Sequence, residues 1–315
     1  MSGVDIWVSE VGPRDGLQSL SRVMPLTAKK DWIAAEAAAG VREIEVGSFV
    51  PARLLPQLAD TAEVVAFAKT IPQLTVAVLV PNARGAEAAI AAGADKLTLP
   101  LSVSETHSLK NLRRTHTQVI EEAAAIAAMV RALPEARRPH FEGSLSTVFG
   151  CTLEGPIPDP QIERLAGELM DAGCDEVGLS DTTGYADPGA VKRMVRLVRG
   201  VVGERALTGI HLHNTRGLGL ANVVAALDCG MTTVDASLGG IGGCPFAPGA
   251  SGNIVTEDLV FMLEAMGLRT GIDLARLLEV RSIVAAALPG EALYGFTPDA
   301  GLPLGFSPAT RRKGI

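Results

Sequence analysis

Eight short runs rich in β-branched residues alternate with eight longer, alanine-rich runs along most of the chain. Short β-branched runs are typical of buried strands, and the longer runs have the length of helices. We predict strands at 6–11, 43–46, 74–80, 96–99, 140–145, 176–179, 209–213 and 233–237. We predict helices at 28–39, 61–69, 83–92, 118–132, 160–172, 188–198, 219–229 and 256–266. This order predicts a parallel sheet with helical crossovers, and eight units close a (β/α)₈ TIM barrel.

An open doubly wound sheet is the alternative arrangement of such units. That fold carries G-x-G-x-x-G after its first strand, whereas this chain has G-P-R-D-G-L-Q there. We therefore predict one barrel domain at 1–288, with an extra helix at about 274–288, and a Pro/Gly-rich tail at 289–315. Glycines follow the ends of four predicted helices, where a left-handed cap costs least. They are Gly40, Gly93, Gly173 and Gly230.

The composition limits the partners that the chain can have. Its net charge is −7, from 28 Lys+Arg and 35 Asp+Glu, which argues against a basic nucleic-acid-binding face. We find no apolar run near the roughly 18 residues of a membrane span, and the first predicted strand begins at Ile6, which leaves no room for a signal or transit peptide. The four cysteines form no Cys-x-x-Cys pair, so we expect a reduced, cytoplasmic protein.

Two of the five histidines, His211 and His213, stand one residue apart in G-I-H-L-H-N. Side chains alternate across a strand, so both imidazoles point the same way, toward the mouth at the C-terminal end of the barrel. Two imidazoles at this spacing can bind one metal ion. A pair of hydrogen-bonded core histidines is the plainer alternative, but this position favours a metal site.

Other polar residues fall at equivalent places. Arg14 and Asp15 follow the first strand, Glu45 lies in the second, and Asp181 follows the sixth. Any one of them alone is best interpreted as a strand-end residue that caps the next helix. Their common position at the mouth of a barrel favours an active site.

The segment 239–253, G-G-I-G-G-C-P-F-A-P-G-A-S-G-N, contains six glycines and two prolines. Such a segment suits a mobile lid better than a helix or strand. Cys244 lies in its middle, where a thiol can give or take a proton. The alternative is a small space-filler, which is our interpretation of Cys151, Cys174 and Cys229. Asn253 either caps the next helix or supplies an oxygen ligand.

Together these phrases resemble the 3-hydroxy-3-methylglutaryl-CoA lyases, TIM-barrel metallolyases related to isopropylmalate and homocitrate synthases. The likeness runs from about residue 5 to 271. The shared phrases are E-V-G-P-R-D-G-L-Q (10–18), I-E-V-G-S-F-V (44–50), H-x-H (211–213), L-A-N (220–222) and G-G-C-P-F-A-P-G-A-S-G-N-I-V-T-E-D-L-V (242–260). The last phrase is specific to the lyases, because the synthases lack its G-G-C-P loop.

The resemblance implies a divalent cation, Mg²⁺ or Mn²⁺, held by Asp15, His211, His213 and Asn253. The residues alone would also suit Zn²⁺ or Fe²⁺. The implied reaction is a retro-Claisen cleavage of 3-hydroxy-3-methylglutaryl-CoA to acetyl-CoA and acetoacetate, as in leucine degradation. A cation bound to the substrate hydroxyl lowers the pKa of that hydroxyl, so that a base can remove its proton.

The resemblance also implies a role for each remaining residue. Arg14 would stabilise charge on the thioester oxygen, and Gln18 would help bind the substrate. Cys244 would protonate the acetyl-CoA enolate, shielded from water by loop closure. Glu45 would orient Arg14 or a metal-bound water, and Asp181 would lie near the substrate hydroxyl. We expect a homo-oligomer, a dimer or a tetramer, with an acyl-CoA substrate and neither a nucleic-acid nor a membrane partner.

The chain departs from the lyase pattern H-x-H-D-T-Y-G-Q-A-L-A-N, because it has H-L-H-N-T-R-G-L-G-L-A-N. Asn214 removes a charge that could hold a histidine in its ligand tautomer, and Arg216 adds one near the mouth. Citramalyl-CoA or a longer branched acyl-CoA is therefore an alternative substrate. A Claisen synthase or aldolase, or a binding barrel without catalysis, is an alternative function. No sequence after Leu268 is long enough for the further domain of the synthases.

Overall fold

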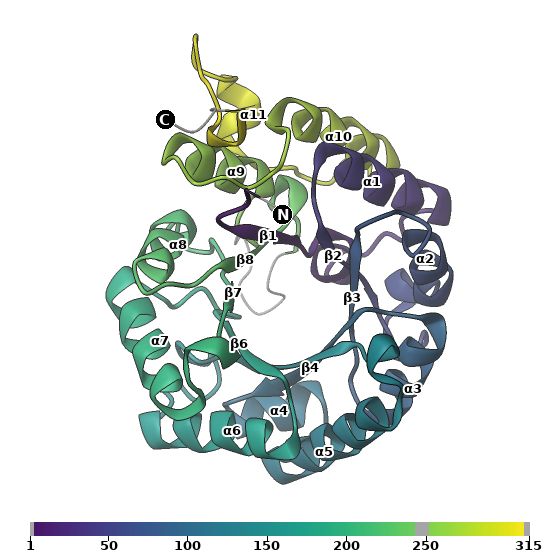
Figure 1. The fold of residues 1–315 in the computed structure, drawn as a ribbon, viewed down its shortest axis with the longest axis vertical. Coiled ribbons are helices and arrows are strands. Elements are labelled where there is room, and N and C mark those ends of the chain that lie inside the picture. Colours follow the sequence, from purple (N-terminus) through teal and green to yellow (C-terminus); the bar gives the residue numbers. More distant parts are fainter. Residues whose placement is uncertain (1–2, 243–251, 312–315) are drawn as a thin grey trace.

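The computed structural model describes residues 3–242 and 252–311, and in it eight strands form a closed barrel. Each strand pairs in parallel with the next, and β8 pairs with β1 (Figure 1). The strands are β1 (Trp7–Glu10), β2 (Glu43–Ser48), β3 (Thr75–Leu79), β4 (Lys96–Ser102), β5 (His140–Ser146), β6 (Glu176–Ser180), β7 (Gly209–His211) and β8 (Thr233–Ala236). The predicted (β/α)₈ TIM barrel is confirmed.

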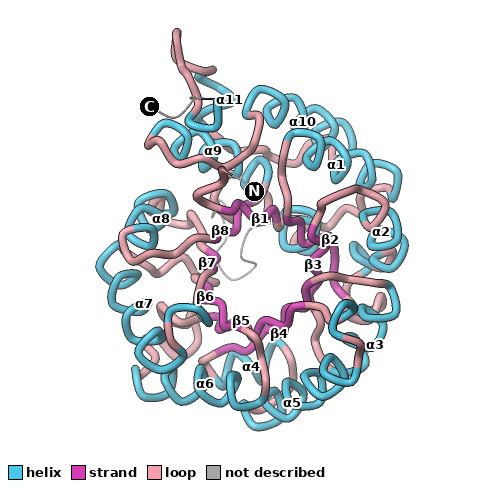
Figure 2. The backbone as a smooth tube through the Cα atoms, in the orientation of Figure 1, coloured by secondary structure: helices cyan, strands magenta, loops and turns pink. Residues whose placement is uncertain are grey.

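Helices surround the strands as an outer ring (Figure 2). They are α1 (Leu26–Ala39), α2 (Thr61–Ala68), α3 (Ala83–Ala92), α4 (Glu105–Asn111), α5 (His116–Ala132), α6 (Asp159–Ala172), α7 (Pro188–Val202), α8 (Gly219–Leu227), α9 (Thr256–Ala265), α10 (Leu274–Ala287) and α11 (Phe296–Ala300). All four predicted capping glycines have positive φ. Among the described residues, no helix combines the length and the apolar character that crossing a bilayer requires.

The main apolar core lies between the barrel wall and the helices. On β8, Val234 and Ala236 are fully buried, whereas the alternating Thr233 and Asp235 are only partly buried. On the helical side, Trp32 and Ile33 of α1 are fully buried. This alternation assigns the apolar side chains to the interface with the helices and leaves polar ones for the barrel interior.

A buried ion cluster fills the end of the barrel where the strands begin. Lys96 Nζ lies 2.7 Å from Glu142, 3.3 Å from Glu176 and 3.6 Å from Glu43. These residues come from β4, β5, β6 and β2, which are not all neighbours, so their side chains can meet only inside the barrel. The cluster lies at this end, and the opposite end, where the strands finish, carries the polar residues predicted for the site.

The tail after α10 contacts α9 through that helix's carboxylates. Asp258 accepts hydrogen bonds from the backbone N–H groups of Phe296 (2.9 Å) and Thr297 (2.6 Å) at the start of α11. Glu264, near the end of α9, accepts one from the N–H of Thr310 (2.7 Å). The tail is therefore held along one helix of the outer ring.

Candidate active site

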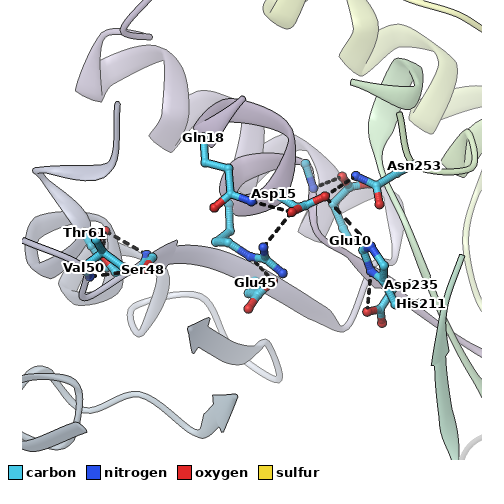
Figure 3. Close-up of polar contacts among 12 residues, drawn as sticks. Glu10, Asp15, Gln18, Glu45, Ser48, Val50, Thr61, His211, Asp235 and Asn253 are labelled. Atoms are coloured by element: carbon cyan, nitrogen blue, oxygen red, sulfur yellow. Dashed lines mark hydrogen bonds and ion pairs between the residues drawn. The ribbon is translucent and has the colours of Figure 1, made fainter. Parts of the chain in front are cut away.

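Arg14 and Asp15 are presented by a tight turn directly after β1. The turn, η1 (Gly12–Gly16), is built on one carbonyl: Val11 O accepts hydrogen bonds from the N–H groups of Arg14 (3.1 Å) and Asp15 (2.7 Å). Pro13 suits the beginning of such a turn because it has no N–H to satisfy. The turn therefore presents both side chains where β1 ends, and Figure 3 shows Asp15 between Gln18 and Asn253.

Asp15 uses one of its carboxylate oxygens to bind neighbours in its own segment. Oδ1 accepts hydrogen bonds from Arg14 Nη1 (2.7 Å) and Gln18 Nε2 (2.6 Å). Burial raises the pKa of the Asp15 carboxyl, but Arg14 and the two histidines outweigh it and hold that pKa well below its usual range. Asp15 is therefore ionised, and its other oxygen is left for partners across the mouth.

The second oxygen of Asp15 faces the histidine pair. Oδ2 lies 3.9 Å from His211 Nε2 and 3.7 Å from His213 Nε2, and the two Nε2 atoms are 3.1 Å apart. It also accepts a hydrogen bond from Asn253 Nδ2 at 2.8 Å. The structure thus brings together the four side chains of the predicted ligand set.

The predicted strand at 209–213 is too long, because β7 ends at His211. His213 instead forms an isolated antiparallel bridge with Asn253, supported by the hydrogen bond from Asn214 N to Gly252 O (3.0 Å). The returning segment takes over the backbone partners that a longer strand would use. The two imidazoles nevertheless converge, with ring centroids 5.1 Å apart.

The donor atoms fit a divalent cation. Asp15, His211 and His213 each offer one ligand atom, and these atoms all lie within 4.8 Å of one another. Cations with ligand distances of about 2.0–2.5 Å need donors at such separations. Asn253 adds a buried Oδ1 without a hydrogen-bond partner in the described part of the chain. Two imidazole nitrogens, a carboxylate and an amide oxygen form a mixed set that several divalent metals accept.

Asn253 is held by close packing of the segments on each side of the mouth. A Cβ at Gly242 would lie 2.6 Å from Asn253 Nδ2 and 3.2 Å from Asp15 O, and Gly242 has φ +110°. Only glycine fits that position without displacing the amide. The glycines near this end of the segment therefore serve a tight fit between η1 and Asn253.

Glu45 holds the guanidinium of Arg14. The Nε of Arg14 lies 2.5 Å from Glu45 Oε2, and both side chains are largely buried. Burial raises the pKa of the Glu45 carboxyl to about 7, against the lowering effect of Arg14. Its other oxygen, Oε1, is buried without a hydrogen-bond partner among the described residues. The predicted orienting contact between Glu45 and Arg14 is thus present in the structure.

Asp235, which was not among the predicted site residues, lies beside His211. It is aligned with His211 across the β7–β8 pair, and its Oδ2 lies 3.1 Å from His211 Nδ1. Burial lowers the pKa of His211, but the hydrogen bond that its Nδ1–H donates to Asp235 and the charge of Asp15 outweigh that effect and raise the pKa. Asn214, which stands where the lyase pattern has an aspartate, accepts a hydrogen bond from Gly219 N (3.0 Å). An aspartate within the eighth apolar run, T-V-D-A, was the available signal.

Asp181 follows β6 and is nearly fully buried. Its oxygens accept hydrogen bonds from the N–H groups of Tyr185 (2.8 Å) and Ala186 (3.1 Å). Burial raises the pKa of this carboxyl. The two hydrogen bonds and the charges of His213 and His211 lower that pKa, but by less than burial raises it. Asp181 thus shapes its own loop beside the histidines, and its nearness to a substrate hydroxyl stays a prediction.

Two further features concern the predicted loop and the departures from the lyase pattern. Cys244 lies outside the described residues. Arg216 bonds the loop after β6, through Nη1 to Gly184 O (2.8 Å), and its guanidinium carbon lies 4.7 Å from the centroid of the Tyr185 ring. Arg216 therefore ties the loops after β6 and β7 together at the mouth.

The fold and the site define a class, a TIM barrel with a candidate metal centre at its C-terminal mouth and an arginine beside it. The family model HMGL-like matches residues 5–284. The chain belongs to this family.

Two relatives share this likeness along most of the chain. A mitochondrial hydroxymethylglutaryl-CoA lyase from Gallus gallus is 39% identical over 283 residues, 89% of this chain and 93% of that protein. A mitochondrial hydroxymethylglutaryl-CoA lyase from Arabidopsis thaliana is 38% identical over 89% of this chain. That match spans 59% of the Arabidopsis protein.

A solved structure is similar over nearly its whole length. It is an HMG-CoA lyase from Acinetobacter baumannii in complex with coenzyme A and 3-methylmalate, 39% identical, with a TM-score of 0.89. The match covers 98% of this chain and 99% of that one. The resemblance drawn from the sequence is confirmed at the level of the family.

Proposed function

We propose that this protein is a carbon–carbon lyase that cleaves 3-hydroxy-3-methylglutaryl-CoA to acetyl-CoA and acetoacetate. The observation that carries the proposal is the convergence of Asp15, His211 and His213 at the barrel mouth in a chain of the HMGL-like family. The names of relatives near 39% identity support the same reaction. A binding barrel without catalysis is the alternative function, and release of acetyl-CoA separates the two.

We propose Mg²⁺ or Mn²⁺ as the cation that Asp15, His211, His213 and Asn253 would hold. When bound, such an ion lowers the pKa of a substrate hydroxyl so that a base can remove its proton. Asp15 is ionised before any ion arrives, because Arg14 keeps the pKa of its carboxyl low. Asp235 keeps a proton of His211 on Nδ1 and leaves the lone pair of Nε2 for a ligand bond.

The chemical step breaks the carbon–carbon bond of the deprotonated substrate, leaving a ketone on one fragment and the acetyl-CoA enolate on the other. Arg14 would stabilise the enolate oxygen, because its guanidinium is already fixed by Glu45 and Asp15. Asp181 would lie near the hydroxyl that loses its proton, and Gln18 would contact substrate from beside Asp15. The Cys244 thiol would then protonate the enolate carbon and complete acetyl-CoA.

A second substrate is favoured by two specific observations. The similar structure from A. baumannii holds 3-methylmalate with coenzyme A, and Arg216 replaces the tyrosine of the lyase pattern at the mouth. A lyase for a related hydroxyacyl-CoA, such as citramalyl-CoA or a longer branched chain, would use the same cluster of side chains.

The experiment is a panel of hydroxyacyl-CoA substrates assayed for acetyl-CoA release, with metal-loaded, chelator-treated and Asp15→Asn protein. We expect release from 3-hydroxy-3-methylglutaryl-CoA by the metal-loaded protein alone. Release only from another acyl-CoA would select the second substrate. No release from any substrate, or equal release after chelation, would contradict the proposal.

The assembly, the compartment and the pathway are further proposals. We propose a homo-oligomer, a dimer or a tetramer, which sedimentation of the purified protein would test. We propose a cytoplasmic enzyme of leucine degradation; relatives are named as both mitochondrial and cytoplasmic. Fractionation of the source cells tests the compartment directly.

A further inference from the structure

Glu10 is a fully buried carboxyl group at the end of β1, and the proposed reaction does not use it. We propose that Glu10 is a positioning residue of the metal site. Its carboxyl group fastens the turn that carries Asp15 to the segments on both sides of residues 243–251, so that Asp15 and Asn253 stay opposite each other.

The hydrogen bonds of Glu10 join three separate parts of the chain. Oε1 accepts from Gly12 N (2.8 Å) in the turn η1 and from Leu238 N (3.0 Å), just after β8. Oε2 accepts from Thr256 Oγ1 (2.7 Å), at the first residue of α9. Thr256 follows Asn253 by three residues. One side chain therefore holds the turn that carries Asp15 and the segments that lead to Asn253 from both sides.

Tight packing makes the turn sensitive to the position of this carboxyl group. A Cβ at Gly12 would lie 2.5 Å from Glu10 Oε1, 2.8 Å from Trp32 Cζ2 and 2.9 Å from Ser237 Oγ. The turn is thus packed directly against Glu10, and no empty space lets the carboxyl group move without moving the turn. Asp15, three residues beyond Gly12, would move with the turn.

Glu10 acts through other residues and not on the substrate. Its side chain has no exposed surface, and the residues around it are Trp32 and Glu36 of α1 and Thr256 and Glu257 of α9. Glu257 is paired with Arg281 (2.5 Å) and accepts from Gly239 N (3.0 Å). This polar cluster thus lies where the end of β1 meets the helices α1 and α9.

Two variants of Glu10 separate position from charge. Glu10→Asp keeps a titratable carboxyl group but withdraws it by one methylene, so it cannot reach all three donors. Glu10→Gln keeps the reach: its oxygen can accept from Gly12 and Leu238, and its NH₂ can donate to Thr256 Oγ1. Mutation of residues that position metal ligands typically lowers the metal affinity by 10–100-fold. We expect the Kd for Mn²⁺ to rise about 10–100-fold in Glu10→Asp and to change little in Glu10→Gln.

The measurement is calorimetric titration of metal-free protein with Mn²⁺, with a thermal melt of each variant. Glu264→Asp is the matched control, because Glu264 is also fully buried and also accepts from backbone N–H and hydroxyl groups, those of Thr270 and Thr310. It lies eight residues along α9, about 12 Å from Thr256 at 1.5 Å per residue. Glu264→Asp should lower the melting temperature and leave the Kd unchanged.

The outcomes distinguish this inference, which rests on the proposed function, from that function itself. Wild-type protein that binds no Mn²⁺ would remove the metal site. Wild-type protein that binds, with an equal Kd for Glu10→Asp or a loss confined to Glu10→Gln, would overturn the positioning role of Glu10. If Glu10→Asp does not fold, Thr256→Val removes one of the three bonds; a several-fold higher Kd supports the role, and an unchanged Kd overturns it.

Discussion

Arg14 is held from two sides before any substrate arrives. Glu45 accepts a hydrogen bond from its Nε and Asp15 accepts one from its Nη1, and all three side chains are largely buried. A guanidinium presents its donors as a rigid fork, so two fixed contacts define the direction of those that remain. A cation prepared in this way stabilises developing negative charge without reorganising during the reaction.

The two fixed contacts of Arg14 predict the effect of Arg14→Lys. An ammonium group is a point charge and cannot keep both carboxylate contacts while facing the enolate oxygen. We expect turnover to fall on the order of 10²–10³-fold with the fold intact. Steady-state kinetics together with circular dichroism would check it, and near-normal turnover would remove Arg14 from the mechanism.

Asp235 predicts a second effect, on metal binding. In Asp235→Asn the amide can donate to His211 Nδ1, which favours the tautomer with the proton on Nε2, where the metal must bind. We expect metal affinity to fall about 10–100-fold. Calorimetric titration with Mn²⁺ is the measurement, and an unchanged affinity would show that His211 does not depend on this partner.

Cys244 stays a prediction from the sequence, because it lies outside the described residues. If it protonates the enolate, Cys244→Ser should keep metal binding and lose turnover by roughly 10²–10⁴-fold, since a hydroxyl is far less acidic than a thiol. Turnover and thermal melting are measured on the same variant. Full activity with a lowered melting temperature would return this cysteine to a packing role.

At the residue scale, the sequence predicted the groups that face the mouth and one residue that supports them, Glu45, but it did not predict the other supporting residues. The sequence could place His211, His213 and Asp15 because the C-terminal ends of all strands meet at the same mouth of a barrel. It could not place Asp235 and Glu10, because their roles depend on the strand register and on contacts between segments far apart in the sequence. The aspartate in T-V-D-A signals a polar group within a strand, but no local pattern shows which partner Asp235 or Glu10 has.

At the element scale, the periodic helices were predicted closely and the irregular ones were missed. The sequence E-T-H-S-L-K-N has no apolar stripe, yet it forms α4, because Ser104 accepts from His107 N (3.1 Å) and caps it. The short helix α11 in the tail was missed for a related reason: it contains a proline and begins after Gly295, so it resembles a turn. Such elements depend on caps and tertiary contacts and not on periodicity.

The ion cluster joining β2, β4, β5 and β6 carries a prediction for stability. Burial lowers the pKa of Lys96, but Glu142, Glu43 and Glu176 outweigh it and keep the ammonium charged. Lys96→Met leaves three carboxylates without their cation. Breaking a buried ion pair costs about 3–5 kcal/mol, so we expect a loss of that size in the free energy of unfolding.

Urea denaturation at pH 8 measures the loss, and a surface pair supplies the control. Lys69 pairs with Asp95 with both side chains more than a third exposed, and such pairs contribute about 0–1 kcal/mol. Lys69→Met should therefore change stability little. Equal effects of the two variants would mean that the cluster inside the barrel contributes no more than a surface contact.

At the scale of the whole molecule, closing the barrel is what assembles the site. Asp15 and Asn253 are far apart in the sequence, yet they meet because β8 pairs with β1. The same closure buries carboxyl groups behind the wall, among them Glu10 and Glu36. Burial, and then the neighbouring charge of Glu10, raise the pKa of Glu36 well above its ordinary value. Folding therefore favours the protonated form of this pair.

The raised pKa of Glu10 predicts a pH dependence of the free energy of unfolding, and one variant of Glu10 tests it. Burial raises the pKa of Glu10 to about 7, against the hydrogen bonds from Thr256, Leu238 and Gly12, whereas the unfolded carboxyl titrates near 4.5. Between those values Glu10 by itself contributes up to about one bound proton to the folded protein that the unfolded chain lacks. The stability that Glu10 contributes is thus complete below about pH 4.5 and is lost as the pH rises through about 7.

Glu10→Gln removes the titration and should keep the contacts. The free energy of unfolding of this variant, relative to wild type, should rise by about 1.4 kcal/mol per pH unit between roughly pH 4.5 and 7 and stay constant above. Urea denaturation of both proteins at pH 5, 6, 7 and 8 gives the difference directly. Both must be metal-free, because metal binding itself releases protons. If the difference in the free energy of unfolding is the same at every pH, Glu10 keeps an ordinary pKa despite its burial. In that case the three hydrogen-bond donors stabilise its negative charge.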